Sequence, residues 1–290
     1  MLGPVEKRQF GVSTHLYHHQ RLCRAHLIEI AAHGFETVEV FATRTHFDYH
    51  NPSAVSDLQQ WLAETGLALS SLHAPVGESY TAGRWSGWLS LASSGAGDRE
   101  RAVAEAEHAL HVARRIPVRV LVVHLGAPRA LQPAGGDSRA AARRSLEELH
   151  HVAEPLGVRI AVEILPNELS RAGSLAHFVD VDLRKADLPG APVGIGFDIG
   201  HAHVEGDVGE ALEAVSEHVL TVDVHDNGGR VDEHLVPFEG TVDWPAALTA
   251  VQKIGYDGPL MLEVGGRGPA KETLARARRA REKMERLMTT

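Results

Sequence analysis

Short apolar runs alternate along the chain with longer segments in which apolar residues recur every three or four positions. The short runs are rich in β-branched residues, as in buried parallel strands, and the longer spacing is typical of helices that cover a sheet. The predicted strands are 10–16, 37–41, 68–73, 118–124, 159–165, 193–198, 220–225 and 259–264. The predicted helices lie near 21–33, 53–65, 98–115, 138–156, 174–187, 208–218, 244–254 and 270–288. Eight strand–helix units in 290 residues predict an α/β fold, a (β/α)8 TIM barrel that forms a single domain over 1–290.

The least regular stretch of the chain is 77–97, which is rich in Gly and Ser and contains Trp85 and Trp88. It follows the third predicted strand, so in a barrel it belongs to the face that carries active sites. Two interpretations remain open. The tryptophans form a lid or a wall that stacks on a sugar, or they attach a long loop to the rim of the barrel.

The composition narrows the class of protein. With 43% hydrophobic and 23% charged residues, and with no visible membrane helix or signal peptide, we expect a cytoplasmic globular protein. A net charge of -9 argues against non-specific binding to nucleic acid. The run 271–286 alternates in charge and keeps regular apolar positions, which predicts a solvated terminal helix. Cys23, the single cysteine, is predicted to be a small buried residue of the first helix.

Several predicted strands end in residues that bind metals. The last four strands carry Glu163, Asp198, His225 and Glu263 at equivalent places. The carboxyl ends of barrel strands point to one shared mouth, where these side chains would meet. Burying three carboxylates there without a cation would be costly. We therefore expect one divalent metal site, and the mixture of carboxylate and imidazole ligands favours an ion such as Zn²⁺ or Mn²⁺.

A second set of residues extends the possible metal site. Its members are His73 and His124 at the ends of the third and fourth strands, His201 just after Asp198, and the loop pair Asp232 and His234. Each has a simpler interpretation as a core histidine, a surface histidine or an ordinary polar loop residue. Because they all fall near the same mouth, these residues could complete another metal site.

Other polar residues are weaker candidates. His15, Glu39 and Glu168 are predicted to line the pocket, and Asp223 either replaces His225 as a ligand or supports it from the same strand face. The other histidines on predicted helices and loops are expected to face solvent. They are His18, His19, His46, His50, His108, His111, His150, His151, His177 and His203.

The chain resembles the xylose-isomerase-like barrel superfamily, which contains sugar phosphate isomerases and epimerases as well as endonuclease IV. The resemblance rests on 34–40 (GFETVEV), 71–75 (SLHAP), 197–202 (FDIGHA) and the long segment 224–244. The epimerase branch implies one divalent ion held by the four strand-end residues named above. It also implies that Glu163 and Glu263 act as acid and base, and that His201 contacts the substrate.

The endonuclease IV branch implies a trinuclear zinc site. Its further ligands match His73, His124, His201, Asp232 and His234, and every one of these residue types is present. That enzyme has a longer segment before its Asp-x-His pair, and the chain shows no counterpart of its DNA-penetrating loops.

Three functions are compatible with these residues. The favoured hypothesis is a divalent-metal-dependent isomerase or epimerase of a sugar or sugar phosphate, in which Glu163 and Glu263 exchange protons on opposite faces of an enediolate. The alternative is a multinuclear-metal hydrolase of the endonuclease IV type that cleaves a phosphodiester. A non-catalytic metal- or sugar-binding barrel is the third. A small sugar-like substrate is the expected partner, nucleic acid and membranes are not, and a homo-oligomer is possible.

A phosphorylated substrate would need an anion site at the mouth. Gly265-Gly266-Arg267-Gly268, after the last predicted strand, is the nearest candidate for such a phosphate cradle. Whether the substrate carries a phosphate stays open at this point.

Overall fold

A closed barrel of parallel strands forms the centre of the computed structural model, which describes residues 8–126, 136–184, 193–265 and 268–289. Within these residues the strand order is β1-β10-β9-β8-β7-β6-β3-β2, closing on itself. The barrel strands are β1 (Phe10–Ser13), β2 (Thr37–Phe41), β3 (Ala68–His73), β6 (Val120–Val123), β7 (Arg159–Glu163), β8 (Gly194–Asp198), β9 (Val219–Val224) and β10 (Leu260–Leu262). The predicted α/β TIM barrel is confirmed.

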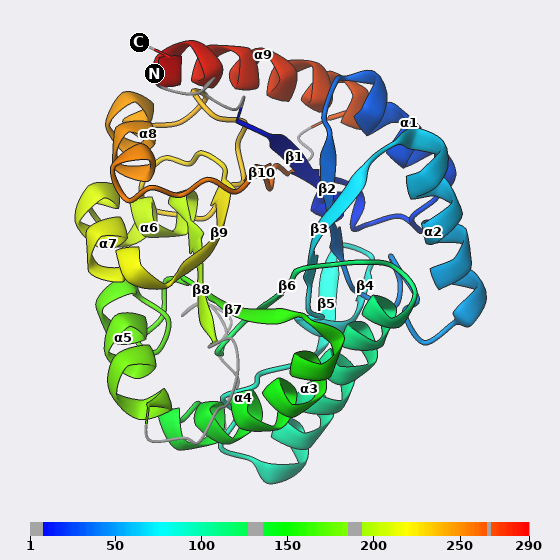
Figure 1. Cartoon of the computed structure of the whole chain (residues 1–290), viewed down its shortest axis with the longest axis vertical. Coiled ribbons are helices and arrows are strands. Elements are labelled where there is room, and N and C mark those ends of the chain that lie inside the picture. The colour runs from blue at the N-terminus through cyan, green and yellow to red at the C-terminus, as the bar shows by residue number, and fades with distance from the viewer. Residues whose placement is uncertain (1–7, 127–135, 185–192, 266–267, 290) are drawn as a thin grey trace, which may run out of the picture.

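Helices surround the barrel in a ring, as Figure 1 shows. They are α1 (Arg24–Ala32), α2 (Pro52–Thr65), α3 (Ala96–Leu110), α4 (Arg139–Ala153), α5 (Ala172–His177), α6 (Ile199–Glu205), α7 (Val208–Val215), α8 (Trp244–Lys253) and α9 (Ala270–Thr289). Residues 271–286 lie in α9, which buries Leu274, Ala277 and Met284 as the alternating pattern predicted. No helix in the described part of the chain is long and apolar enough to cross a membrane.

Local sequence signals explain where these helices begin and end. The side chain of Asn51 accepts a hydrogen bond from the Ser53 amide at the start of α2, and Pro52 occupies the first turn. The helix ends at Gly66, whose φ of 70° lies in the left-handed region that glycine tolerates.

Most of the hydrophobic core lies between the barrel and the helices. Leu121 and Val123 of β6 belong to this core. Because side chains alternate along a strand, their neighbours Val120 and Val122 face the barrel interior, where they form a separate small cluster with Ala161. The inside of the barrel is therefore only lightly filled with apolar side chains.

The stretch predicted to be least regular is a β-hairpin. Its strands are β4 (Gly77–Thr81) and β5 (Arg84–Trp88), paired antiparallel. Ala82 and Gly83 form the turn with φ values of 51° and 76°, the conformation that twists correctly for a two-residue hairpin. The sequence indicated this hairpin only weakly, because alanine seldom adopts the positive φ that the turn requires.

Three other predictions were wrong. α1 begins at Arg24, and Cys23 precedes it as a half-buried N-cap residue rather than a buried helical one. His46 and His150, expected to face solvent, are 0% and 3% exposed. His46 hydrogen-bonds the Gln20 carbonyl oxygen, and His150 lies on the buried face of α4. The chain also forms α6 directly after β8, which the pattern did not predict.

The buried His46 makes the stability of the fold depend on pH. Burial lowers the pKa of this imidazole from 6.5 to about 4, although its Nδ1 lies 2.6 Å from the carbonyl oxygen of Gln20. Between these pH values the unfolded chain binds more protons than the folded protein. The free energy of unfolding therefore decreases as the pH falls through this window.

We predict that His46→Gln removes this part of the pH dependence. Relative to the variant, the wild-type protein should lose roughly 3 kcal/mol of unfolding free energy between pH 7 and pH 4. Urea denaturation at both pH values measures the difference. The exposed residue His19 provides a control, since His19→Gln should follow the wild-type curve. Parallel curves for the wild type and His46→Gln would contradict the prediction.

Candidate metal centre at the barrel mouth

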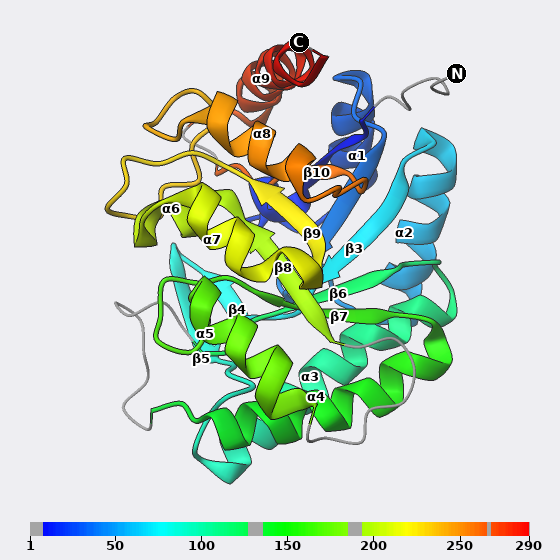
Figure 2. The same cartoon turned by 60° about the vertical axis from the view of Figure 1, so that its left-hand side comes forward.

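The strand-end residues of the predicted metal site all lie at the carboxyl end of the barrel. Glu163 and Asp198 end β7 and β8, while His225 and Glu263 directly follow β9 and β10. These strands are consecutive neighbours in the barrel. In Figure 2 the strands run toward the left, to the side where the β4–β5 hairpin lies. All four side chains are buried, with at most 4% of each residue exposed.

Glu163 is surrounded by imidazoles. Its Oε2 lies 2.9 Å from Nε2 of His73 and 2.9 Å from Nε2 of His124, and its Oε1 lies 3.1 Å from Nδ1 of His201. Burial alone would raise the pKa of Glu163, but these imidazoles, with His124 foremost, hold it well below its usual range. The carboxylate is therefore ionised at neutral pH.

Asp232 lies between the imidazoles of His201 and His234 at the mouth. Its Oδ2 lies 3.1 Å from Nε2 of His201 and 3.0 Å from Nε2 of His234. His234 adopts a φ of 46°, an unusual backbone conformation for a residue other than glycine. The loop thus holds His234 in a strained position that directs its ring at Asp232.

Three of the imidazoles that face these carboxylates are also held by the backbone. Nδ1 of His73, His201 and His234 lies 2.8–2.9 Å from the carbonyl oxygens of Ala74, Ile164 and Glu263, respectively. A carbonyl oxygen only accepts, so each Nδ1 carries the proton. In a neutral ring the Nε2 lone pair then points at a carboxylate oxygen, which is repulsive unless a cation or a second proton lies between them.

The pKa values of these rings reflect the same arrangement. Burial lowers the pKa of an imidazole, yet the Glu163 carboxylate raises that of His73 to about 9, and Asp232 raises that of His234 to about 10. The pKa of His201 is raised well above its usual value, mainly by Asp198 and Asp232 against the effect of burial. Histidines whose Nδ1 is fixed by the backbone and whose Nε2 faces a carboxylate cluster are typical metal ligands.

His225 gives the clearest test of whether a metal fits. Its Nε2 lies 3.0 Å from Oδ1 of Asp198 and 3.6 Å from Oδ1 of Asp232. Among the described residues, neither ring nitrogen of His225 has a hydrogen-bond partner, nor do Oδ2 of Asp198 and Oδ1 of Asp232. Buried polar atoms are rarely left without partners. A divalent cation shared by these nitrogen and oxygen atoms would satisfy them, so the residues fit a metal ion.

Several groups of residues in the described part of the chain offer ligand atoms within 4.8 Å of one another. They are His201–His225–Asp232–His234, His15–His234–Glu263, His73–His124–Glu163 and Glu163–Asp198–His201. The four predicted ligands Glu163, Asp198, His225 and Glu263 are thus distributed over several overlapping groups. Glu263 lies in the group with His15 and His234. Burial raises the pKa of Glu263 to about 8, with the His234 charge opposing and Glu163 adding to the shift.

His15 is the potential ligand that the sequence reasoning undervalued. It was predicted to end the first strand as pocket lining, but it lies on a 3-10 turn (Thr14–Tyr17) that follows β1. Its Nδ1 is 3.8 Å from Oε1 of Glu263. The sequence did contain a signal for His15 as a ligand, because it directly follows an apolar strand, as the stronger candidates do.

The weaker candidates occupy different places. Glu39 is buried inside the barrel, where it accepts a hydrogen bond from Ser71. Asp223 is also buried but belongs to none of the ligand groups. Glu168 is exposed and pairs with Arg171 instead of lining the pocket. Of the suggested phosphate cradle, Gly266 and Arg267 lie outside the described residues.

Aromatic side chains border the metal centre on the side of the hairpin. The ring of Trp85 lies 5.9 Å from that of Phe41 and 6.1 Å from that of His18, between ring centres. Phe41 in turn lies 4.7 Å from His73 and 5.0 Å from His15. We call Trp85, Phe41 and His18 the aromatic wall, because they connect the hairpin to the edge of the ligand groups.

Asp226 fixes the loop that carries Asp232 and His234. Its Oδ1 accepts hydrogen bonds from the backbone N–H groups of Asn227 and Val242. Its Oδ2 accepts hydrogen bonds from the backbone N–H of Phe238 and the indole N–H of Trp244. All four distances are 2.8–3.1 Å. Paired backbone hydrogen bonds of 2.8 Å also connect Asp226 with Leu235. A single fully buried carboxylate therefore organises both ends of the loop.

The chain belongs to the xylose isomerase-like TIM barrel family, whose sequence profile matches residues 27–289. The protein MJ1311 from Methanocaldococcus jannaschii is 28% identical over 259 residues, which cover 88% of this chain and 83% of that protein. An L-ribulose-5-phosphate 3-epimerase, UlaE from Salmonella paratyphi A, is 30% identical over 162 residues, covering 54% of this chain and 53% of the enzyme.

Solved structures share the whole architecture. A D-tagatose 3-epimerase-like protein has 26% sequence identity and a TM-score of 0.78, covering 97% of both chains. The IolI protein, crystallised with a bound zinc atom, has 16% identity and a TM-score of 0.76, covering 96% of this chain and 98% of its own. At that lower identity the likeness extends to the fold alone.

We predict that Asp226→Asn strongly destabilises the protein. The new amide group would face two N–H donors inside the buried loop, so we expect a loss of about 2–4 kcal/mol in unfolding free energy. Asp223→Asn is a matched control. Burial and the surrounding carboxylates raise the pKa of Asp223 well above its usual value, which favours the uncharged form that asparagine resembles. Its replacement should cost less than about 1 kcal/mol.

Urea denaturation of the metal-free proteins at pH 7 measures both effects. Equal losses in the two variants would show that Asp226 does not organise the loop in the way its hydrogen bonds indicate.

Proposed function

We propose that the protein is a divalent-metal-dependent isomerase or epimerase of a small sugar or sugar phosphate, with the cytoplasm as its proposed location. The observation that carries this proposal is the position of Glu163 and Glu263. These buried carboxyl groups flank Asp198 and His225 across four consecutive strands, so a substrate seated over a shared ion has a proton-transfer group on each side. The similarity to sugar epimerases supports the same assignment.

A divalent ion held by Glu163, Asp198, His225 and Glu263 would supply Lewis acidity, polarising neighbouring carbonyl and hydroxyl oxygens of an open-chain sugar and acidifying the C–H between them. The two glutamates then differ in their readiness to move a proton. The imidazoles around Glu163 keep it ionised, which suits a base. In the absence of a metal, burial raises the pKa of Glu263 to about 8, so Glu263 takes up a proton more readily than Glu163, which suits an acid.

The outcome of the reaction follows from where the second proton is delivered. If Glu163 removes a proton from one face and Glu263 returns one to the opposite face of the same carbon, the carbon is inverted and the reaction is an epimerisation. Delivery to the neighbouring carbon gives an isomerisation. The aromatic wall beside His73 and His15 offers ring faces on which the C–H side of a sugar packs.

We predict that this chemistry incorporates solvent deuterium at the reacting carbon. With ketoses such as tagatose, psicose and ribulose 5-phosphate as candidates, the metal-loaded wild type should form a product labelled in D₂O, measured by NMR. Glu163→Gln and Glu263→Gln should each lower kcat by roughly 100- to 10,000-fold, because each removes a proton-transfer group. The exposed Glu168 provides a control, and Glu168→Gln should retain activity. Turnover without any label in the product would contradict an enediolate.

A metal-dependent phosphodiester hydrolase is the second candidate. It is supported by the additional ligand groups around His73, His124 and Asp232, which offer places for more than one ion. Clustered ions activate a water and stabilise both the attacking and leaving oxygens of a phosphodiester.

Metal stoichiometry in wild type and His234→Ala distinguishes these two candidates. The single-ion epimerase predicts one tightly bound ion per chain, retained in the variant, because His234 is outside the predicted quartet. Elemental analysis of the purified proteins gives the number directly. Two or three ions per chain, one of which is lost in His234→Ala, together with cleavage of bis(p-nitrophenyl) phosphate, would favour the hydrolase instead.

A further inference from the structure

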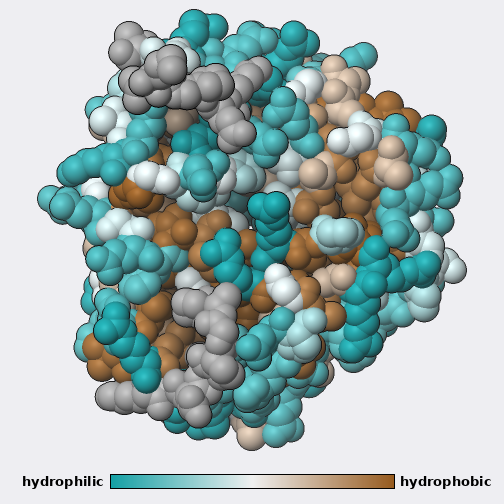
Figure 3. Space-filling view, viewed as in Figure 1, coloured by the Kyte–Doolittle hydropathy of each residue, from teal (hydrophilic) through white to brown (hydrophobic). Residues whose placement is uncertain are grey.

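A large hollow lies at the opposite end of the barrel from the metal centre. It has a volume of about 1120 Å³, and the beginnings of β2, β3, β6, β7, β9 and β10 line it. Figure 3 shows the molecule from this end, with a depression near the centre where hydrophilic side chains lie among hydrophobic ones. We call this hollow the basal cavity. Its volume is at the upper end of what small-molecule sites in proteins occupy.

Two glycines leave room for side chains on neighbouring strands that line the basal cavity. A Cβ added to Gly11 would lie 2.6 Å from the terminal methyl of Met261, and one added to Gly196 would lie 3.1 Å from Oγ1 of Thr221. Both glycines therefore face the interior and place no side chain there. Ala161 contributes only a methyl group to the same inner surface.

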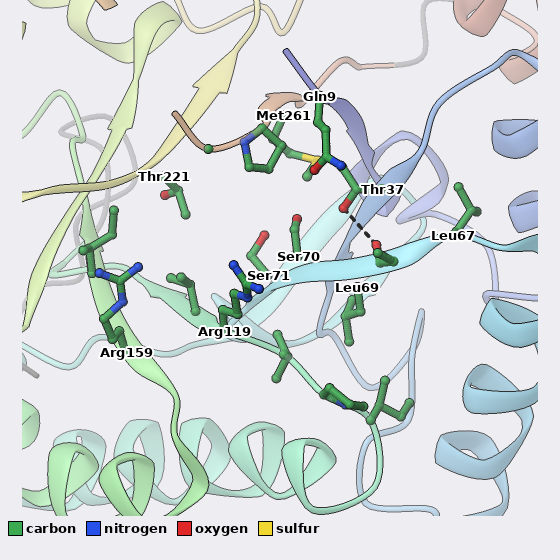
Figure 4. Close-up of a pocket in the computed structure, with 18 of the residues that line it drawn as sticks. Gln9, Thr37, Leu67, Leu69, Ser70, Ser71, Arg119, Arg159, Thr221 and Met261 are labelled. Carbon is green, nitrogen blue, oxygen red and sulfur yellow. Dashed lines mark hydrogen bonds between the residues drawn. The ribbon is translucent and has the colours of Figure 1, made fainter. Parts of the chain in front are cut away.

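Two arginines stand side by side at the wall of this cavity. The backbone N–H of Arg159 donates to the carbonyl oxygen of Arg119 at 2.9 Å, so the residues are direct neighbours on β7 and before β6. Figure 4 shows both side chains lining the cavity, with Ser70, Ser71 and Thr221 around the same space. Within the described part of the chain, neither guanidinium has a carboxylate partner or a side-chain hydrogen bond.

Other residues that line the basal cavity add polar and apolar surface beside the two arginines. Oγ1 of Thr221 is buried and has no hydrogen-bond partner among the described residues. Asp257 also lines the cavity, and its negative charge raises the pKa of the neighbouring Arg8. Leu69, Val120 and Met261 give the cavity an apolar surface. Adjacent like charges repel each other, and the forked donors of two guanidinium groups are suited to the oxygens of a single dianion.

We propose that the basal cavity is a second binding site, separate from the metal centre, for a small organic dianion of the phosphate monoester class. Arg119 and Arg159 bind the phosphate group from adjacent strands. The organic part of the ligand rests on the apolar surface of Leu69, Val120 and Met261. Because this site lies at the other end of the barrel, its occupancy does not require the catalytic metal.

Binding of phenyl phosphate to metal-free protein tests the proposal. Calorimetry on chelator-treated protein removes any contribution from ions at the barrel mouth. We expect saturable binding of one phenyl phosphate per chain, with inorganic phosphate weaker because it lacks the apolar part. The double variant Arg119→Ala/Arg159→Ala should weaken binding by about tenfold or more, since it removes the charged donors.

A matched control distinguishes specific binding in the cavity from a general attraction between phosphate and positive charge. Arg101→Ala/Arg278→Ala removes the same charge from α3 and α9, where these arginines pair with Asp98 and Glu282. This control should bind like the wild type.

The proposal is overturned if wild type shows no saturable binding below about 10 mM, if the control loses as much affinity as the cavity variant, or if the cavity variant binds normally. Both cavity arginines are exposed, so circular dichroism should show a folded variant, and the single change Arg159→Gln gives the same readout.

Discussion

Buried carboxylates face imidazole nitrogens at the barrel mouth, and each such pair needs a proton or a cation between its atoms to avoid repulsion. Backbone carbonyls fix the protons of several histidines on Nδ1, so their Nε2 atoms point at Glu163 and Asp232. Protons on every ring would relieve the repulsion, and a divalent cation would relieve it while also satisfying the unpartnered nitrogens of His225. The strand ends, the strained backbone of His234 and the loop held by Asp226 all serve this one arrangement.

The barrel separates two tasks at its ends. At the carboxyl ends of the strands, carboxylate and imidazole side chains fill the mouth around the proposed ion. At the amino ends, the basal cavity opens between the strands, and Arg119 and Arg159 provide positive charge in its wall. The overall charge of -9 hides this contrast, because charge summed over a chain does not show where it gathers.

The sequence predicted the barrel because each strand is an apolar run and each helix has an apolar face. It also predicted that Glu163, Asp198, His225 and Glu263 lie at the same end of the barrel, because the carboxyl ends of parallel strands converge there. It did not predict how these residues group, since that depends on loop conformation. The position of Glu263 beside His15 requires a turn after β1, and the hairpin around Trp85 requires positive φ at an alanine. Burial of His46 likewise depends on a contact between distant loops.

We expect a metal ion in the space between the carboxylates and imidazoles of the barrel mouth. Crystals grown with Zn²⁺ or Mn²⁺ and measured at the absorption edge of the ion locate it directly by anomalous scattering. The account predicts a strong peak about 2.0–2.3 Å from side-chain atoms of Glu163, Asp198 and His225, with Glu263 completing the site. Fully loaded crystals without a peak at the mouth, and with these histidines instead hydrogen-bonded to the carboxylates, would contradict it.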